Sequence, residues 1–311
     1  MKNTQKMKHE HSHDTDHHHH HSEGDEAGHH HHHHEHHEPG HRHEHGSEHH
    51  HDHPHGHHSH EHGAAKSSGV PVLTVRAASG LSGDMILTGL ALMLECSTDA
   101  MQALVRDTGL PLPADCVVFE SHDVNSVAGW RARIDLPEEH AHRTWSDIRT
   151  IIGDSALAPG AKELAVKAFS LLAEAEGQVH GRSPQEVTFH EVGALDSILD
   201  ICLASALYER LAPSRFVCSP LPLGDGGVLC AHGWLPVPAP AVLHLLENVP
   251  VCGFSGKGET VTPTAIALLK AFGAEFGLWP AMTIGRRALV YGSKVFPDAP
   301  NGAIWAYGPS L

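Results

Sequence analysis

The sequence predicts a fold of the α/β or α+β class, in which helices and short strands mix in one large body behind a polar tail. Segments with apolar residues at helical spacing alternate with short β-branched runs and turn residues, and this mixture predicts the class. The composition divides the 311 residues sharply, because 28 of the 35 histidines lie between His9 and His62. We therefore expect a disordered, histidine-rich tail over residues 1–66 and a body over residues 67–311 that is long enough to bury a sizeable core.

The body is expected to begin with a strand, a glycine-rich turn and a helix. The apolar run 70–78 precedes the turn at 79–84, and an apolar helical segment follows it. A second helix is expected over 98–108, ended by Gly109. Two β-rich segments on either side of Asn125-Ser126 then predict an antiparallel strand pair.

The middle of the chain is expected to be mainly helical. A helix is predicted around 144–152, and apolar residues at helical spacing predict a long one over 161–179. After a break at 181–184 and the short run 187–194, another helix should extend to Leu211.

Short extended segments and two helices should complete the body. Strands or extended loops are expected at 216–222, 224–232 and 249–253, with a turn at 255–258. One helix should cover 240–247, and another should cover 263–276 with Thr262 as its N-cap and Pro263 at its first position. These patterns do not determine the order of the strands.

Composition restricts the class of partner. Without the tail, 16 basic and 25 acidic residues leave a net charge of −9, which argues against nucleic acid and against an anionic membrane surface. No apolar stretch is long enough to span a bilayer, and the first residues lack the apolar core of a secretory signal. The six cysteines form no C-x-x-C pair and are typical of reduced thiols. We expect a soluble, cytoplasmic protein.

The tail indicates metal binding. Its histidines alternate with acidic residues and glycine, and imidazoles in a flexible chain offer many exchangeable sites for nickel, zinc, copper or cobalt. The densest runs consist of His17, His18, His19, His20, His21, His29, His30, His31, His32, His33 and His34. A purification tag is the alternative, but histidines interleaved with acids over more than fifty positions favour a natural metal reservoir.

The glycine-rich turn is a candidate anion site. Its glycines allow backbone N–H groups to face a phosphate at a helix N-terminus, although the Walker pattern is absent. The candidate ligand-binding residues of this turn are Ser79, Gly80, Ser82, Gly83 and Asp84. Thr264, in the first turn of a later helix, could also meet an anion. The alternative is a turn and helix cap without function.

A second candidate site combines His190 and Glu191 with Asp196 and Asp200. The two aspartates are four residues apart and therefore share one helix face. An imidazole with carboxylates can bind a divalent ion or act as a general base. The alternative is a helix cap and a solvated aspartate, but a charge within the apolar run 198–203 needs a partner, which favours function.

Two further pairs of residues could bind metal. Cys230 and His232 would share a face if both lay on one strand, and a buried cysteine beside a hydrogen-bonded histidine is an equal alternative. His140 and His142 could pair in the same way, or they could be ordinary surface residues.

Four motifs of the body closely resemble the LarC family of nickel-insertion proteins. They are SGLSGDM (79–85), FHEVGALDSILDI (189–201), CSPLPLGDGGVLCAHGWLPVPAPAVLHLL (218–246) and GETVTPTAIALL (258–269). The resemblance covers roughly residues 71–301. It implies a nickel chelatase of the lyase class that inserts Ni2+ into pyridinium-3,5-bisthiocarboxylic acid mononucleotide, forming two Ni–S bonds and one Ni–C bond. It also implies CTP with Mn2+ or Mg2+ as cofactors, and a lactate racemase-like racemase or epimerase that receives the finished cofactor.

The sequence departs from the family pattern at three places. Arg76-Ala77-Ala78 replaces an acidic residue followed by Cys-Phe, and Thr188 replaces the first histidine of H-F-H-E-V-G. The chain also stops at Leu311, whereas longer members continue into a region that binds the nucleotide and metal. From these departures we expect either a first half that needs a separate C-terminal LarC half or, equally, a decayed or repurposed copy.

The resemblance assigns expected roles to the candidate residues. Glu191 or His190 would act as the base or handle nickel, Asp196 and Asp200 would orient them, and the 79–84 turn would hold the substrate phosphate. The alternative is a non-catalytic nickel buffer or metallochaperone that acts through the tail. A third hypothesis is a metal-dependent enzyme acting on another nucleotide-like substrate.

Overall fold

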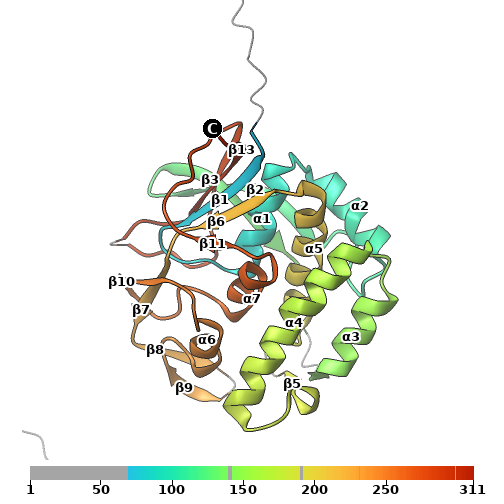
Figure 1. The fold of residues 1–311 in the computed structure, drawn as a ribbon. Coiled ribbons are helices and arrows are strands. Elements are labelled where there is room, and N and C mark those ends of the chain that lie inside the picture. Colours follow the sequence, from blue (N-terminus) through green and yellow to red (C-terminus); the bar gives the residue numbers. More distant parts are fainter. Residues whose placement is uncertain (1–68, 139–141, 190–191, 231, 298) are drawn as a thin grey trace, which may run out of the picture. The chain divides into compact units, whose positions relative to one another are not determined.

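The computed structural model describes residues 69–138, 142–189, 192–230, 232–297 and 299–311 (Figure 1). All of these residues belong to one compact unit, Gly63–Leu311. The expected tail, with the runs His17–His21 and His29–His34, lies outside the described residues. His140, His190 and Glu191 lie outside them as well.

A mixed seven-stranded sheet forms one layer of the body. Its strands, in spatial order, are β11 (Glu275–Phe276), β6 (Arg215–Cys218), β1 (Pro71–Ala77), β13 (Ala303–Pro309), β12 (Arg286–Val290), β3 (Val127–Ile134) and β2 (Val117–Val124). The central strand β1 runs parallel to β6 and antiparallel to β13. The sheet therefore joins the beginning of the described chain to its last strand.

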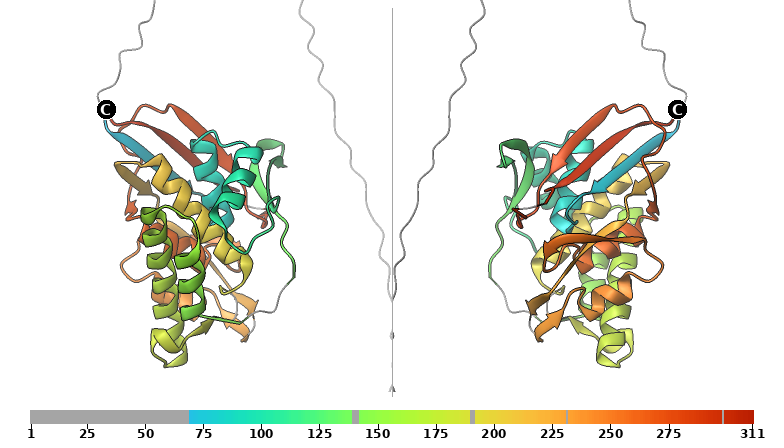
Figure 2. Two further views of the ribbon diagram at one scale, coloured as in Figure 1. Left: turned by 90° about the vertical axis from the view of Figure 1, so that its right-hand side faces the viewer. Right: turned by 90° about the vertical axis from the view of Figure 1, so that its left-hand side faces the viewer.

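Helices pack beside this sheet in successive layers (Figures 1 and 2). Helix α1 (Gly83–Met93) contacts β3, β12 and β13, and α5 (Leu195–Leu211) packs on α1. The long helix α4 (Pro159–His180) then packs on α5 and on α7 (Pro263–Ala271). Because α5 lies between α1 and α4, apolar residues are buried around most of its circumference.

The remaining helices are α2 (Thr98–Thr108), α3 (Trp145–Asp154) and α6 (Pro240–Leu245), with a short 3-10 turn at Pro184–Glu186. Local signals fix their ends. The Ser97 side chain accepts the Ala100 N–H at the start of α2, and Gly109 ends that helix with a φ of 63°. Thr144 and Asp147 form a reciprocal capping box at the start of α3.

The core reaches from the sheet into the helices. Trp305 of β13 is fully buried and stacks on Phe216 of β6 at a ring-centroid distance of 6.2 Å. A Cβ at position 89 would collide with the Trp305 indole, so Gly89 allows α1 to approach the sheet closely.

Three two-stranded sheets lie outside the seven-stranded sheet. Strand β7 (Leu221–Asp225) runs parallel to β10 (Val251–Lys257), and β8 (Gly227–Cys230) forms a hairpin with β9 (Gly233–Pro236). Strands β4 (Arg143–Thr144) and β5 (Thr188–Phe189) pair antiparallel. This region is drawn in yellow-green to orange in the lower half of Figure 1.

The structure confirms the mixed class and most of the predicted elements. The helix over 98–108 has its predicted bounds, and Asn125 and Ser126 form the turn between two antiparallel strands. The caps Thr262 and Pro263 also lie where they were predicted.

Three local predictions were wrong. Strand β10 continues to Lys257 instead of turning at 255, because it stays paired with β7 as far as Asp225. Helix α7 ends at Ala271, since Gly273 adopts a φ of 68° that stops it. Strand β8 ends at Cys230, so His232 lies in the hairpin turn and does not share a strand face with Cys230.

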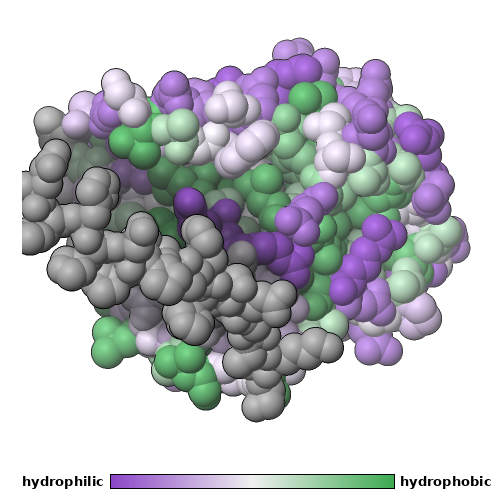
Figure 3. All heavy atoms as spheres, turned by 90° about the horizontal axis from the view of Figure 1, so that it is seen from above, coloured by the Kyte–Doolittle hydropathy of each residue, from purple (hydrophilic) through white to green (hydrophobic). Residues whose placement is uncertain are grey.

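The surface of the body is mixed in polarity. Seen from above, hydrophilic residues gather along much of the rim, and hydrophobic residues lie toward the middle of the face (Figure 3). Among the described residues, no helix combines the length and apolar character needed to cross a membrane.

Candidate functional site

The glycine-rich turn is held against the segment before α7. The Leu81 N–H donates to the Thr260 carbonyl at 2.9 Å, and the Thr262 N–H donates to the Leu81 carbonyl at 3.1 Å. Gly80 has a φ of 136°, and a Cβ there would overlap the Thr260 carbonyl oxygen. Glycine is therefore required at position 80, and these contacts bring the first turns of α1 and α7 together.

Asp200 of α5 lies against both of these first turns. A Cβ at position 83 would collide with Asp200 Oδ2 and with the Thr264 methyl group, so Gly83 leaves the space that the carboxylate occupies. Asp200 Oδ1 is inaccessible to solvent and has no hydrogen-bond partner among the described residues. Asp200 as a whole residue is half-buried, and its expected role in the site stays a prediction.

Three aspartates form an electrostatically coupled group, which we call the aspartate cluster: Asp84, Asp196 and Asp200. Burial raises the pKa of Asp200 well above its usual value, and the negative charges of Asp84 and Asp196 raise it further. Burial also raises the pKa of Asp84, although the Ser82 hydroxyl donates to its Oδ1 and opposes the shift. Asp196 is exposed and accepts the Ser197 N–H at 2.7 Å.

The aspartate cluster joins two motifs that the sequence analysis kept apart. Asp84 was predicted as part of a phosphate cradle, whereas Asp196 and Asp200 were predicted as part of a base or metal site. Among the described residues, no three histidine, cysteine or acidic side chains already form a metal site.

Two adjoining cavities open beside the turn. The larger one, of about 420 Å³, is lined by Ser79, Gly80 and Ser82. The smaller one, of about 240 Å³, is lined by Asp84 with arginines of β3, and it shares Gly292 with the larger cavity. Gly83 and Thr264 are buried and line neither cavity.

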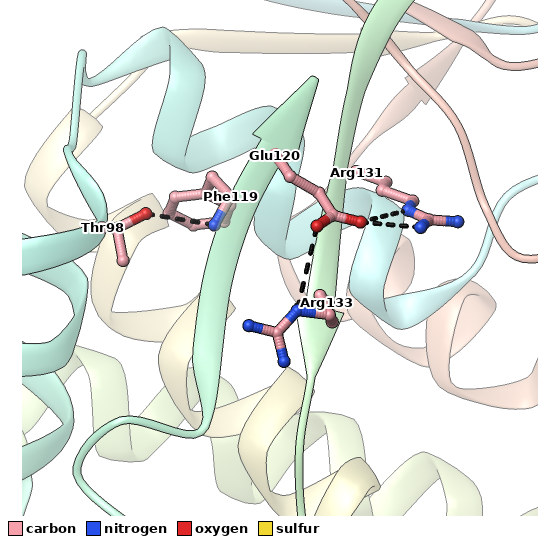
Figure 4. Close-up of polar contacts among 5 residues, drawn as sticks. All are labelled: Thr98, Phe119, Glu120, Arg131 and Arg133. Atoms are coloured by element: carbon pink, nitrogen blue, oxygen red, sulfur yellow. Dashed lines mark hydrogen bonds and ion pairs between the residues drawn. The ribbon is translucent and has the colours of Figure 1, made fainter. Parts of the chain in front are cut away.

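Basic side chains that the sequence analysis did not single out face the smaller cavity. Arg131 and Arg133 of β3 line it and share one carboxylate, Glu120 of β2 (Figure 4). Arg131 Nη2 lies 2.7 Å from Glu120 Oε1, and Arg133 Nε lies 3.8 Å from Glu120 Oε2. Two guanidinium groups against one carboxylate leave a net positive charge, which favours an anion. Their i,i+2 spacing on the predicted strand was a signal that could have identified them.

A lysine completes the basic lining of the larger cavity. The Lys294 ammonium donates to the Lys257 and Glu259 carbonyls at 2.7 and 3.1 Å and lies 4.9 Å from the centroid of the Phe296 ring. The two cavities therefore bring cationic side chains, the glycine-rich turn and the Asp84 carboxylate together in one region.

His232 and Cys230 lie at a third cavity, of about 560 Å³, which also contacts the end of α4. The Cys230 thiol donates to the Gly233 carbonyl at 3.5 Å. The expected roles of His190 and Glu191 concern residues outside the described part of the chain, and the neighbouring Val192 lines this third cavity.

Comparisons with known proteins agree on one family. The profile of the family described as nickel insertion protein matches residues 73–304. A candidate nickel insertion protein of Syntrophotalea carbinolica is 40% identical over 235 residues, covering 72% of this chain and 56% of the relative. A second, from Geobacter metallireducens, is 42% identical over 223 residues, with 72% and 57% covered.

One relative has a more specific name. The pyridinium-3,5-bisthiocarboxylic acid mononucleotide nickel insertion protein of Desulfitobacterium hafniense is 39% identical over 218 residues, covering 70% of this chain and 53% of the relative. The chain thus spans somewhat more than half the length of the curated relatives that it matches. No solved structure matches the chain.

Proposed function

Because the chain belongs to the nickel insertion protein family, we propose that it carries the site at which Ni2+ is inserted into pyridinium-3,5-bisthiocarboxylic acid mononucleotide. The observation that carries the proposal is the aspartate cluster, of which Asp84 lines the smaller of two adjoining cavities that also have basic side chains in their walls. The substrate has anionic thiocarboxylates and a phosphate, so it suits such a lining. Its ring must also lose a proton before nickel can bond to carbon.

The turn and the basic residues are proposed to bind the substrate. Ser79, Gly80 and Ser82 line the larger cavity at the N-terminus of α1, where backbone N–H groups and the helix dipole favour a phosphate. Arg131 and Arg133 would hold a second anionic group in the smaller cavity.

Asp200 is proposed to accept the ring proton. Burial raises the pKa of the Asp200 carboxyl, and a carboxylate with a raised pKa is a stronger base than an ordinary aspartate. Asp84 and Asp196 contribute by raising that pKa through their charges. Nickel itself needs little activation, since sulfur donors bind it readily.

The finer part of the proposal concerns the other components of the reaction. The family resemblance implies that CTP, with Mn2+ or Mg2+, activates the reaction in a C-terminal LarC half. It also implies that a racemase or epimerase receives the product.

A reconstitution tests the proposed function. The chain is incubated with Ni2+, the mononucleotide, CTP and Mn2+ or Mg2+, with and without the C-terminal part of a relative. Formation of the nickel-bound cofactor is followed by its mass. We expect product when both parts are present and little from either part alone. Nickel binding with no product under any of these conditions would overturn the proposal in favour of a non-catalytic nickel buffer.

A further inference from the structure

The β8–β9 hairpin presents two apolar side chains at the larger cavity. Leu229 and Trp234 lie directly opposite each other in the strand pair and are 65% and 74% exposed. Both residues line the cavity, as do Gly227 and Val228 of the same hairpin. Single apolar residues are normal on a protein surface, but a tryptophan in the wall of a cavity offers a ligand a large flat contact.

A glycine lets the indole of Trp234 lie close to the backbone of β8. A Cβ at position 227 would come within 3.2 Å of the ring atom Cε3 and within 3.5 Å of Cζ3. A longer side chain at position 227 would therefore displace the indole. The hairpin supports the ring in this way, and most of the Trp234 surface stays open to a ligand.

The other walls of the larger cavity carry polar and basic groups. Ser79 and Ser82 come from the glycine-rich turn, and Lys294 contributes an ammonium group. The cavity volume of about 420 Å³ lies in the range of small-ligand sites, roughly 300–1,000 Å³. A cavity with an indole, hydroxyl groups and an ammonium group in its walls suits a ligand that combines a flat ring with an anionic group.

The larger cavity also adjoins the helices that hold the aspartate cluster. Its lining includes Ser82 and Thr262, which are the N-caps of α1 and α7. Asp200 lies against the first turns of these two helices, in the space that Gly83 leaves. A ring bound in this cavity therefore lies next to the helices that position the proposed base.

We propose that Trp234 binds the substrate ring, with its indole stacked on the pyridinium of the mononucleotide. A pyridinium ring carries a delocalised positive charge, and the face of an indole attracts cations more strongly than the face of any other aromatic side chain. Leu229, on the paired strand, extends the apolar surface beside the indole. The inference rests on the proposed function for the identity of the ligand, and Trp234 takes no part in the proton transfer.

Tryptophan fluorescence of the full chain tests this contact. The chain is titrated with the mononucleotide without nickel or CTP, so only substrate binding is measured. An electron-poor pyridinium stacked on an indole quenches its emission, so the native chain should lose more emission than Trp234→Phe. Light absorption by the ligand is the same in both samples and cancels in the comparison. Ribose 5-phosphate, which has the sugar phosphate without the ring, should cause no quenching.

Calorimetric titration with the mononucleotide measures the affinity that the indole contributes. Trp234→Ala should raise the Kd about tenfold, the loss expected for one stacked aromatic contact, whereas Trp234→Phe keeps a ring and should retain most of the affinity. Trp279→Ala removes another exposed tryptophan, which lines none of the three cavities, and should change neither the Kd nor the quenching. Circular dichroism checks that each variant is folded.

Equal quenching in the native chain and in Trp234→Phe, or an unchanged Kd in Trp234→Ala, would overturn the proposal. A native chain that does not bind the mononucleotide would overturn it as well. The insertion assay is a separate test. Insertion with the native KM in Trp234→Ala would end this inference alone, whereas stacking on Trp234 without any nickel insertion would end the proposed function alone.

Discussion

Asp200 carries an electrostatic cost that its described neighbours do not offset. Its Oδ1 is buried without a hydrogen-bond partner in the described part of the chain, and the two nearby charges that shift its pKa are both negative. Such a group costs the fold stability, and uncompensated buried carboxylates are found at functional sites. The uncompensated charge of Asp200 therefore supports the proposal that this residue takes part in the reaction.

The substitution Asp200→Asn should stabilise the fold increasingly as pH rises. The folded-state pKa of Asp200 lies above the unfolded value near 3.8, so its favourable contribution is complete below that value and is lost as pH rises through the folded pKa. Between these two pKa values, the free energy of unfolding of the variant should rise relative to that of the native chain by about 1.4 kcal/mol per pH unit. Urea unfolding from pH 4 to pH 8 measures the difference, and a constant difference would refute the raised pKa.

The substitution Gly83→Ala should destabilise the protein by about 1–3 kcal/mol, because the added methyl overlaps Asp200 and Thr264 in a packed region. Gly153→Ala in α3 is the matched control. A Cβ there meets nothing within 4 Å, so this change should stabilise by about 0.4–1 kcal/mol. Thermal unfolding of both variants checks the contact, and equal melting temperatures would contradict it.

At the scale of elements, β3 places both arginines on the same face toward the smaller cavity. Strand alternation directs residues two apart to one side, and Glu120 on the paired strand β2 holds the two guanidinium groups (Figure 4). The hairpin is tied to α2 by the Phe119 N–H, which donates to Thr98 at 3.1 Å. A small set of local contacts thus fixes the proposed anion-binding wall.

The substitution Arg133→Gln should raise the KM for the mononucleotide roughly 10-fold to 100-fold, the range expected for one charge-assisted hydrogen bond, with little change in kcat. Arg287→Gln on the neighbouring strand β12 is exposed and should leave both constants unchanged. Initial rates of the reconstituted reaction separate the two constants. A lower kcat with an unchanged KM would show that Arg133 does not bind substrate.

Local signals explain why many elements were predictable from the sequence. Gly109 and the Thr262-Pro263 pair act within one helical turn of themselves, and each defines a helix end in the structure as predicted. The last two strands of the sheet, β12 and β13, were not predicted. Their place depends on pairing with β1, more than two hundred residues earlier in the chain, and no local pattern encodes that pairing.

At the scale of the whole molecule, the candidate site is a product of tertiary structure. Asp84 and Asp200 are separated by more than a hundred residues, and they meet only because α1 and α5 pack against each other beneath the sheet. Sequence reasoning identified both residues, since each stood in an unusual local context. Only the tertiary structure places the two residues in one site.

The histidine-rich tail should add metal capacity to the body. If its imidazoles form independent sites, the full chain should bind several Ni2+ ions at about pH 7.5 and lose them below about pH 5.5, where the imidazoles are protonated. Deletion of residues 1–66 should remove most of the bound metal. Calorimetric titration of both chains measures this, and an unchanged stoichiometry after deletion would end the reservoir hypothesis.

The most direct test of the central claim measures insertion by Asp200→Asn under single-turnover conditions in the reconstituted system. The amide keeps the volume of the carboxylate but cannot accept the ring proton. We predict a loss of at least about a hundredfold in the insertion rate per folded molecule, the lower range for a general base, with no loss of thermal stability. The exposed Asp107→Asn should retain the native rate. An Asp200→Asn variant that inserts nickel at the native rate would contradict the assignment of this site.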